Sequence, residues 1–233
     1  MLSVTRADGS AERQTLELLR SRSGEVDRKV ATVVTQIIET VRQEGDAALR
    51  RYAEQFDSAA PARLEVTKEE IEQALDTADA DFVQALRRAK ENITAFHARQ
   101  KQQSFWDAQP NGVILGQRVR GLHRVGLYVP GGTAAYPSSV LMNAIPAKIA
   151  GVEELIMVTP PKSGGANPDI LAAAAIAGVD RVFLTGGAQA VAALAYGTQT
   201  IPQVDKIVGP GNIYVATAKK LLYGQVDIDM IAG

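Results

Sequence analysis

The chain has 233 residues, of which 46% are hydrophobic and 22% are charged, and these proportions are typical of a globular protein with a sizeable core. Its 25 basic and 26 acidic residues give a formal net charge of -1, which argues against the basic surface that a nucleic-acid partner requires. The absence of cysteine excludes disulfides, iron–sulfur clusters and thiolate zinc sites, and it fits a cytoplasmic protein.

Residues 1–120 are predicted to be mainly helical. The first twenty residues mix basic with acidic side chains, as in a short amphipathic helix rather than a targeting peptide. Apolar residues recur on one helical face at 33–41, and Gly45-Asp46 is expected to end this helix and to cap the next one. Thr67 begins a capping-box sequence, TKEE. The long helix that follows has a packing seam of Phe82, Leu86, Ala89, Ile93 and Phe96.

The pattern changes between Phe105 and Arg120. Pro110-Asn111-Gly112 indicates a turn, and beyond it the residues alternate with a period of two at Val113, Leu115, Gln117 and Val119. We interpret this segment as a strand or hairpin that connects two regions.

From Val125 onward, strands and helices are predicted to alternate. The expected strands are residues 125–129, 155–158, 182–184, 204–208 and 226–230. The expected helices begin at Ser138 or Ser139, at Asn167-Pro168, near Ala188 and at Asn212. This alternation is the signature of a parallel sheet with helices on its faces. The fold class is therefore α/β, with a Rossmann-like parallel sheet domain at 121–233 preceded by the helical region and hairpin of 1–120.

Two details of this part bear on the prediction. Pro146 should kink its helix near Met142. The most apolar run, residues 170–179, is too short to span a bilayer, so we expect no membrane partner.

Glycine-rich turns follow the predicted strands, and ligands of open parallel sheets bind beyond the carboxyl ends of the strands. The turns read PGGTAAYPSS, PPKSGGANP, TGGAQA and GPGN. The helix starts behind them can hold an anion such as pyrophosphate. Gln189 and Asn212 could both donate and accept hydrogen bonds there, and Tyr128 offers an aromatic face and a hydroxyl. Each turn alone could equally be a plain connection, so the spacing indicates only an α/β domain that binds a nucleotide-like anion.

The sequence VGLYVPGGTAAYPSSVLMNAIPAKIAGV closely resembles the histidinol dehydrogenase family. The resemblance continues through LTGGAQAVAALAYGT, VDKIVGPGNIYVATAKKLLYG and VDIDMIAG, and it reaches back to VRQEGDAALRRYAEQFD and AFHARQ. It implies incomplete Rossmann domains with NAD in the crevice at the strand tips. It also implies a homodimer that oxidises L-histidinol through the aldehyde to L-histidine, the end of histidine biosynthesis, with two NAD molecules and zinc. By motif, the family's NAD contacts fall on Tyr128, Gln189 and Asn212.

The chain ends at DMIAG, the phrase that opens the signature segment of that family. The resemblance places the zinc ligands, the substrate-binding residues and the catalytic glutamate and histidines beyond it. We therefore expect an N-terminal half with no catalytic or metal-binding residue, inactive alone, with zinc only in the full-length enzyme. His97 and His123 are expected to be structural or solvated, because neither has a second ligand at metal-like spacing. The helices of 1–120 are expected to belong to a domain completed by strands after Gly233.

Two other functions remain open from the sequence. The NAD-related motifs do not discriminate substrate, so a relative that oxidises another small polar alcohol, such as a sulfonated diol, fits them equally. A non-catalytic nucleotide-binding or assembly module would also contain these turns.

Overall fold

Five parallel strands and one antiparallel strand form a single sheet with the order β1-β6-β5-β4-β7-β8. The computed structural model describes residues 4–5, 7–22, 28–57, 61–131, 135–162 and 165–231. The strands are β1 (Glu65–Val66), β4 (Arg124–Tyr128), β5 (Glu154–Thr159), β6 (Arg181–Leu184), β7 (Lys206–Val208) and β8 (Asp227–Ile228). The predicted α/β fold class is confirmed. The sequence analysis did not predict β1, which pairs antiparallel with β6 at the sheet edge.

The strand order creates a switch point in the middle of the sheet. From β4 the chain builds β5 and β6 on one side, and then returns to place β7 and β8 on the other side of β4. The connections that leave β4 and β7 therefore diverge at the carboxyl edge. Open α/β sheets bind ligands in the crevice that such a divergence leaves.

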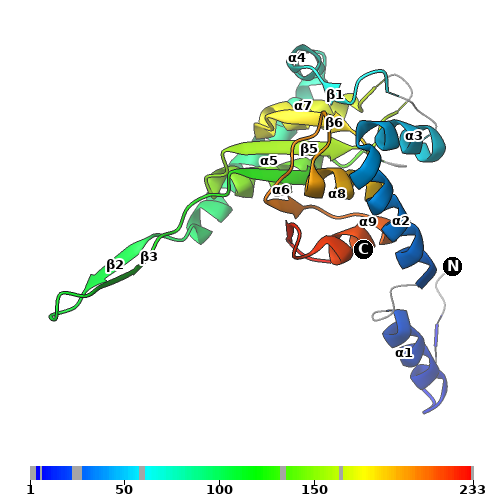
Figure 1. Cartoon of the computed structure of the whole chain (residues 1–233), viewed down its shortest axis with the longest axis horizontal. Coiled ribbons are helices and arrows are strands. Elements are labelled where there is room, and N and C mark those ends of the chain that lie inside the picture. Colours follow the sequence, from blue (N-terminus) through cyan, green and yellow to red (C-terminus); the bar gives the residue numbers. More distant parts are fainter. Residues whose placement is uncertain are drawn as a thin grey trace.

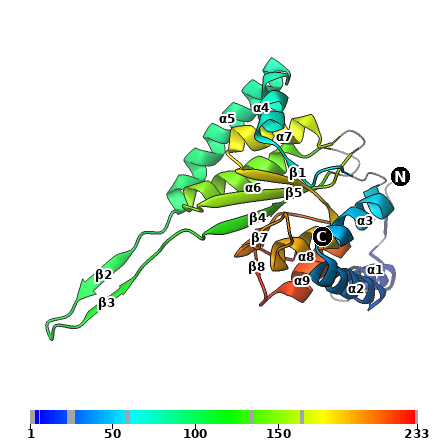
Figure 2. The same cartoon turned by 45° about the horizontal axis from the view of Figure 1, so that its top comes forward.

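Helices cover both faces of the sheet, as Figure 2 shows. One face packs against α2 (Arg28–Glu44), α3 (Asp46–Asp57), α8 (Gly187–Tyr196) and α9 (Ile213–Leu222). The other face packs against α4 (Lys68–Asp76), α5 (Ala80–His97), α6 (Pro137–Ile149) and α7 (Pro168–Ala177). The two apolar cores follow from the alternation of side chains along each central strand, for example Ile156 and Val158 on one face and Leu155 and Met157 on the other.

The N-terminal helices pack on this sheet domain. The apolar face of α2 contacts α8 and α9, and the seam of α5 contacts α6 and α7. Leu86 is buried, whereas Phe96 at the end of the seam is 63% exposed. Most of the seam therefore packs against α6 and α7, while the expectation that these helices belong to a domain completed after Gly233 stays a prediction. The division into domains at residue 120 stays a prediction.

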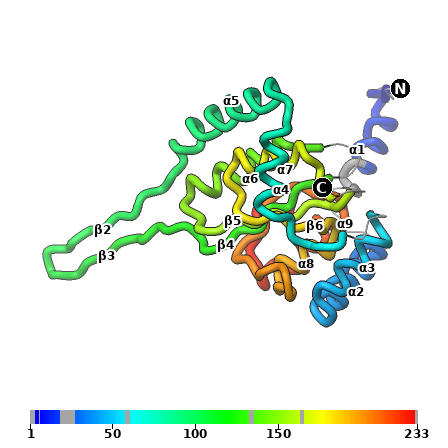
Figure 3. Tube along the Cα trace, turned by 90° about the horizontal axis from the view of Figure 1, so that it is seen from above, coloured from blue at the N-terminus to red at the C-terminus, as the bar shows by residue number. Residues whose placement is uncertain are grey.

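Two segments extend away from the sheet (Figures 1 and 3). The predicted hairpin is present as β2 (Phe105–Ala108) and β3 (Ile114–Gln117), which follow the short 3₁₀ helix η1 (Ala98–Gln100) and form a projecting arm. All residues of its two strands are exposed. Helix α1 (Ala11–Arg22) lies apart from the sheet beyond α2.

The helix starts show which capping predictions hold. Thr67 forms the predicted capping box with Glu70, and Asn167 caps α7 through the backbone N–H of Asp169. Helix α6 begins at Pro137 instead of after Ser138 or Ser139, because proline fits the first helical position and needs no cap for its missing N–H. Asp46 does not cap α3. Its carboxylate accepts hydrogen bonds from the backbone N–H and hydroxyl of Thr200.

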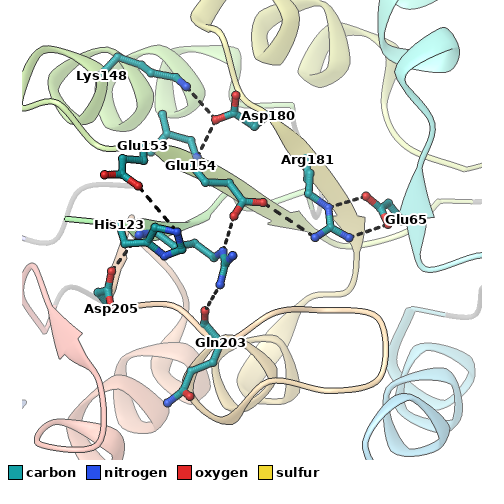
Figure 4. A network of polar contacts seen from close by, with 11 residues as sticks. Glu65, His123, Lys148, Glu153, Glu154, Asp180, Arg181, Gln203 and Asp205 are labelled. Carbon is teal, nitrogen blue, oxygen red and sulfur yellow. Dashed lines mark hydrogen bonds and ion pairs between the residues drawn. The ribbon is translucent and has the colours of Figure 1, made fainter. Parts of the chain in front are cut away.

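A network of charged side chains joins the amino ends of the strands (Figure 4). Arg181 forms a bidentate pair with Glu65 of β1 at 2.7 and 2.9 Å, and it lies 3.9 Å from Glu154. Arg124 donates from Nε to Glu154 at 2.5 Å, and Lys148 donates to Asp180 at 2.7 Å. The paired charges connect β1, β6, β5 and β4, and they leave the opposite edge to the glycine turns. No helix in the described part of the chain is long and apolar enough to cross a membrane.

Replacing Thr67 by alanine should lower the free energy of unfolding by about 1 kcal/mol, because the backbone N–H of Glu70 loses its capping acceptor. Thr40→Ala is the matched control, since the Thr40 hydroxyl only bonds back to the Gln36 carbonyl within α2. Urea unfolding of both variants measures the difference. Equal stabilities for the two variants would contradict the role of the cap.

Candidate functional site

The three side chains that the sequence singled out line one cavity. Tyr128 at the end of β4, Gln189 in the first turn of α8 and Asn212 before α9 surround a volume of about 900 Å³. The cavity lies at the carboxyl edge of the sheet beside the switch point, where the fold predicts a ligand.

Tyr128 links two of the glycine turns. Its hydroxyl accepts a hydrogen bond of 3.0 Å from the backbone N–H of Gly187, so it holds the start of α8 against the end of β4. Burial raises the pKa of Tyr128 to about 12, and the phenol keeps a proton that it can donate into the cavity. Tyr128 as a whole is only 3% exposed and belongs to the core on the face of the sheet that α8 covers. The expected aromatic face is therefore not offered to a ligand.

Asn212 caps α9 and keeps only part of its amide for a ligand. The side-chain carbonyl accepts from the backbone N–H groups of Tyr214 and Val215 at 3.1 and 3.2 Å. The carbonyl is thus used within the protein, and the predicted contact of this amide with a ligand stays a prediction. Its NH₂ group remains as a donor at the wall of the cavity.

Gln189 is the side chain with the most unused hydrogen-bonding capacity. It is 2% exposed, and its amide makes no hydrogen bond with any residue in the described ranges. Gly187 makes room for it, because a Cβ at Gly187 would lie 2.6 Å from the Gln189 Oε1. A ligand in the cavity could satisfy both the carbonyl and the NH₂ group of this buried amide.

A buried ion pair supports the turn that carries Asn212. Lys219 of α9 is fully buried, and its ammonium group donates to the Gly209 carbonyl at 3.0 Å and to the Asp229 carboxylate. Asp229 also accepts from the backbone N–H of Gly209 at 2.8 Å. Gly209 itself lies so close to β4 that a Cβ would be 2.2 Å from the Tyr128 carbonyl oxygen. The turn is therefore fixed both by charge and by close packing.

The Pro-Gly-Gly turn after β4 is partly described. Pro130 and Gly131 line the cavity, and a Cβ on Gly131 would lie 3.1 Å from Thr159 Oγ1 and from Pro160. Gly132 to Ala134 lie outside the described residues, as do Ser163 and Gly164 of the PPKSGGANP turn. The described part of the Pro-Gly-Gly turn, Pro130-Gly131, follows β4 and forms a wall of the cavity.

Several lining residues were not identified from the sequence. Phe56, Tyr136 and Tyr214 place aromatic rings at the mouth of the cavity, and they are 51%, 45% and 41% exposed. Asp57 and Lys162 add one acidic and one basic group. Phe56 and Asp57 come from α3, far from the glycine turns in sequence. The only signal for them was the phrase RRYAEQFD within the segment that resembles the family.

The two histidines lie apart from this cavity. His97 Nδ1 is 2.6 Å from Gln100 Oε1, and His123 lies 3.8 Å from Glu153 with both side chains largely exposed. Within the described ranges, no three His, Cys, Asp or Glu side chains gather as a metal site would require.

Comparisons with known proteins agree on one family. The model of the histidinol dehydrogenase family matches residues 20–233. A histidinol dehydrogenase of Clostridium acetobutylicum is 54% identical over 228 residues, which are 97% of this chain and 53% of that protein. One of Syntrophotalea carbinolica is 59% identical over 206 residues, 88% of this chain and 48% of that protein. The chain therefore spans about half the length of the curated relatives it matches.

A solved structure supports the same relationship. The crystal structure of histidinol dehydrogenase from Elizabethkingia anophelis superposes with a TM-score of 0.82 at 39% identity, and covers 87% of this chain and 47% of that one. The predicted family resemblance is confirmed.

Gly209→Ala should destabilise the chain by several kcal/mol more than Gly224→Ala. Both glycines have positive φ, 115° and 99°, so both substitutions strain the backbone by about 1–3 kcal/mol. Only the Cβ at Gly209 also collides with backbone, whereas nothing lies within 4 Å of a Cβ at Gly224. Urea unfolding compares the two. Equal losses would show that the turn can move away from β4 without cost.

Tyr128→Phe should change how stability depends on alkaline pH. The folded pKa of Tyr128, about 12, lies above the ordinary value of 10.0, so its contribution is complete below pH 10 and is lost as pH rises through 12. The unsubstituted chain should thus lose more stability than Tyr128→Phe in that window. Urea unfolding at about pH 8 and about pH 11 measures both proteins. Parallel losses would show that Tyr128 ionises normally.

Proposed function

Because the chain belongs to the histidinol dehydrogenase family, we propose that it provides the NAD-binding part of an enzyme that oxidises L-histidinol through the aldehyde to L-histidine. The observation that carries the proposal is the convergence of Tyr128, Gln189 and Asn212 on one cavity at the switch point of the sheet. The sequence selected these residues by their motifs, and the fold brings them together from three separate elements.

The residues of the cavity fit a dinucleotide. The aromatic rings of Phe56, Tyr136 and Tyr214 can pack against its bases, and the volume of about 900 Å³ is within the range of cofactor sites. The buried amide of Gln189 and the free NH₂ group of Asn212 can orient its polar edges. When bound, NAD would accept hydride from the alcohol carbon.

The start of α8 is suited to hold the anionic part of the dinucleotide. Its first backbone N–H, from Gly187, is directed to Tyr128, while those of Ala188 and Gln189 have no acceptor among the described residues. Exposed N–H groups at a helix N-terminus stabilise negative charge. We assign the pyrophosphate to this end of the cavity, where Lys162 is the one cationic side chain among the described lining residues.

Zinc, histidinol and the homodimer enter the proposal through the family alone. The described residues gather no metal-binding group, so no contact in this chain is assigned to zinc. The proposal places zinc, the substrate and the catalytic groups in the part of the relatives' length that this chain does not span, and it expects no histidinol oxidation by this chain alone.

Removing the polar groups of the cavity should weaken NAD binding. Gln189→Ala and Asn212→Ser should each raise the dissociation constant several-fold, because each removes a hydrogen bond worth about 1 kcal/mol. Serine at 212 keeps an oxygen to cap α9 and removes only the NH₂ donor. Calorimetric titration of this chain with NAD measures the effect.

The controls are Gln225→Ala and Asn92→Ser, which change exposed residues outside the cavity. They should bind NAD as the unsubstituted chain does. Unchanged NAD affinity in both Gln189→Ala and Asn212→Ser, or no binding of NAD by the unsubstituted chain, would refute the proposed site.

A further inference from the structure

Asp57 is a half-buried acidic residue of the cavity, and one of its two carboxylate oxygens has no partner. It is the last residue of α3 and lines the same cavity as Tyr128, Gln189 and Asn212. Its Oδ2 atom is buried and has no hydrogen-bond partner among the described residues. Lys162 is the other charged side chain among the described lining residues; it is exposed, and neither it nor Asp57 forms an ion pair with a described residue.

This position is unfavourable for the fold by itself. Burial without a partner raises the pKa of Asp57, because removal from water disfavours the charged form. In addition, the residue lies at the C-terminal end of α3, where the helix dipole disfavours an anion. Both effects destabilise the ionised Asp57 carboxylate, and a ligand that donates a hydrogen bond to it would offset them.

The chemistry of the cavity indicates which donor fits. A carboxylate accepts two hydrogen bonds at once, and a vicinal diol presents two neutral O–H donors at matching spacing. Phe56, the residue before Asp57, places an aromatic ring at the same wall of the cavity, where a base attached to that ribose could pack. A ribose with its adenine base satisfies both groups together.

The position where Rossmann domains usually have such an acid is not acidic in this fold. In Rossmann domains the acidic residue that binds the adenosine ribose follows the second strand of the unit. Here the second strand, β5, ends at Thr159 and is followed by Pro160, Pro161 and Lys162. Asp57 supplies an acid to the same crevice from α3, an element outside the alternating strand–helix unit.

We propose that Asp57 accepts the 2′- and 3′-hydroxyls of the adenosine ribose and makes the cavity select NAD against NADP, whose 2′-phosphate would face its carboxylate. The inference rests on the proposed function of the cavity. It adds the residue that determines which of the two dinucleotides is bound.

The position of Lys162 would predict the opposite preference, for NADP over NAD. A cation after the second strand can accommodate a 2′-phosphate, and a site governed by Lys162 would favour NADP. One difference favours Asp57. Lys162 is exposed, so solvent and salt screen its charge, whereas the free Asp57 oxygen is buried and acts at a lower dielectric constant.

The test is calorimetric titration of the chain with NAD and with NADP. The unsubstituted chain should bind NAD about tenfold or more tightly than NADP, and Asp57→Asn should weaken NAD while strengthening NADP, which reduces the preference to a few-fold. Glu54→Gln, an exposed change on α3 outside the cavity, should leave both affinities unchanged.

A stability measurement separates binding from a structural role. Asparagine at 57 removes the unpaired charge, so Asp57→Asn should unfold at the same or a higher urea concentration than the unsubstituted chain. A lower midpoint, an unchanged NAD-to-NADP ratio in Asp57→Asn, or tighter binding of NADP by the unsubstituted chain would overturn the inference. If NAD still binds and depends on Gln189, the proposed function survives that result. If no dinucleotide binds, both proposals fail together.

Discussion

The candidate site depends on one buried cation. Lys219 has no exposed surface. Its ammonium group donates hydrogen bonds to the Gly209 carbonyl and the Asp229 carboxylate, on the face of the sheet that α9 covers. Replacing a buried pair by apolar residues often costs little, so this pair is weak evidence for stability. It is better evidence for position, because an ammonium left without partners would be strongly unfavourable in any other arrangement of the turn. The turn that begins at Gly209 leads directly to Asn212, so this requirement determines where the Asn212 amide lies.

Local chemistry made much of the fold predictable. The caps at Thr67, Asn167 and Asn212 follow from side chains that bond backbone two or three residues away, and each forms as the sequence indicates. The strands and helices after β4 follow from apolar runs and glycine turns. Two features that the sequence did not indicate involve longer distances. Asp46 bonds Thr200 on a distant loop, and β1 is a two-residue strand that exists only because β6 has a free edge.

In the candidate site, too, the sequence indicated some features and the fold was needed for others. Motifs identified Tyr128, Gln189 and Asn212, but they did not show how much of each side chain was already used within the protein. Tyr128 is committed to Gly187, and the Asn212 carbonyl is committed to its own helix. Asp57 could not be selected from spacing, because a carboxylate near a helix end is usually solvated. Its significance appears only when α3 is packed against the sheet and the carboxylate oxygen loses water without gaining a donor.

The amino and carboxyl edges of the sheet differ in how fully their polar side chains are paired. At the amino edge, the charges of Arg124, Glu154 and Arg181 find partners in a connected network. At the carboxyl edge, Gln189 is 2% exposed and its amide has no hydrogen bond to a described residue, and one oxygen of Asp57 is buried without a partner. Within the described residues, the hydroxyls of Thr185 and Thr217 are also buried without partners, but neither residue lines the cavity, whereas Asp57 and Gln189 do. A polar ligand in the cavity could satisfy the groups of both Asp57 and Gln189.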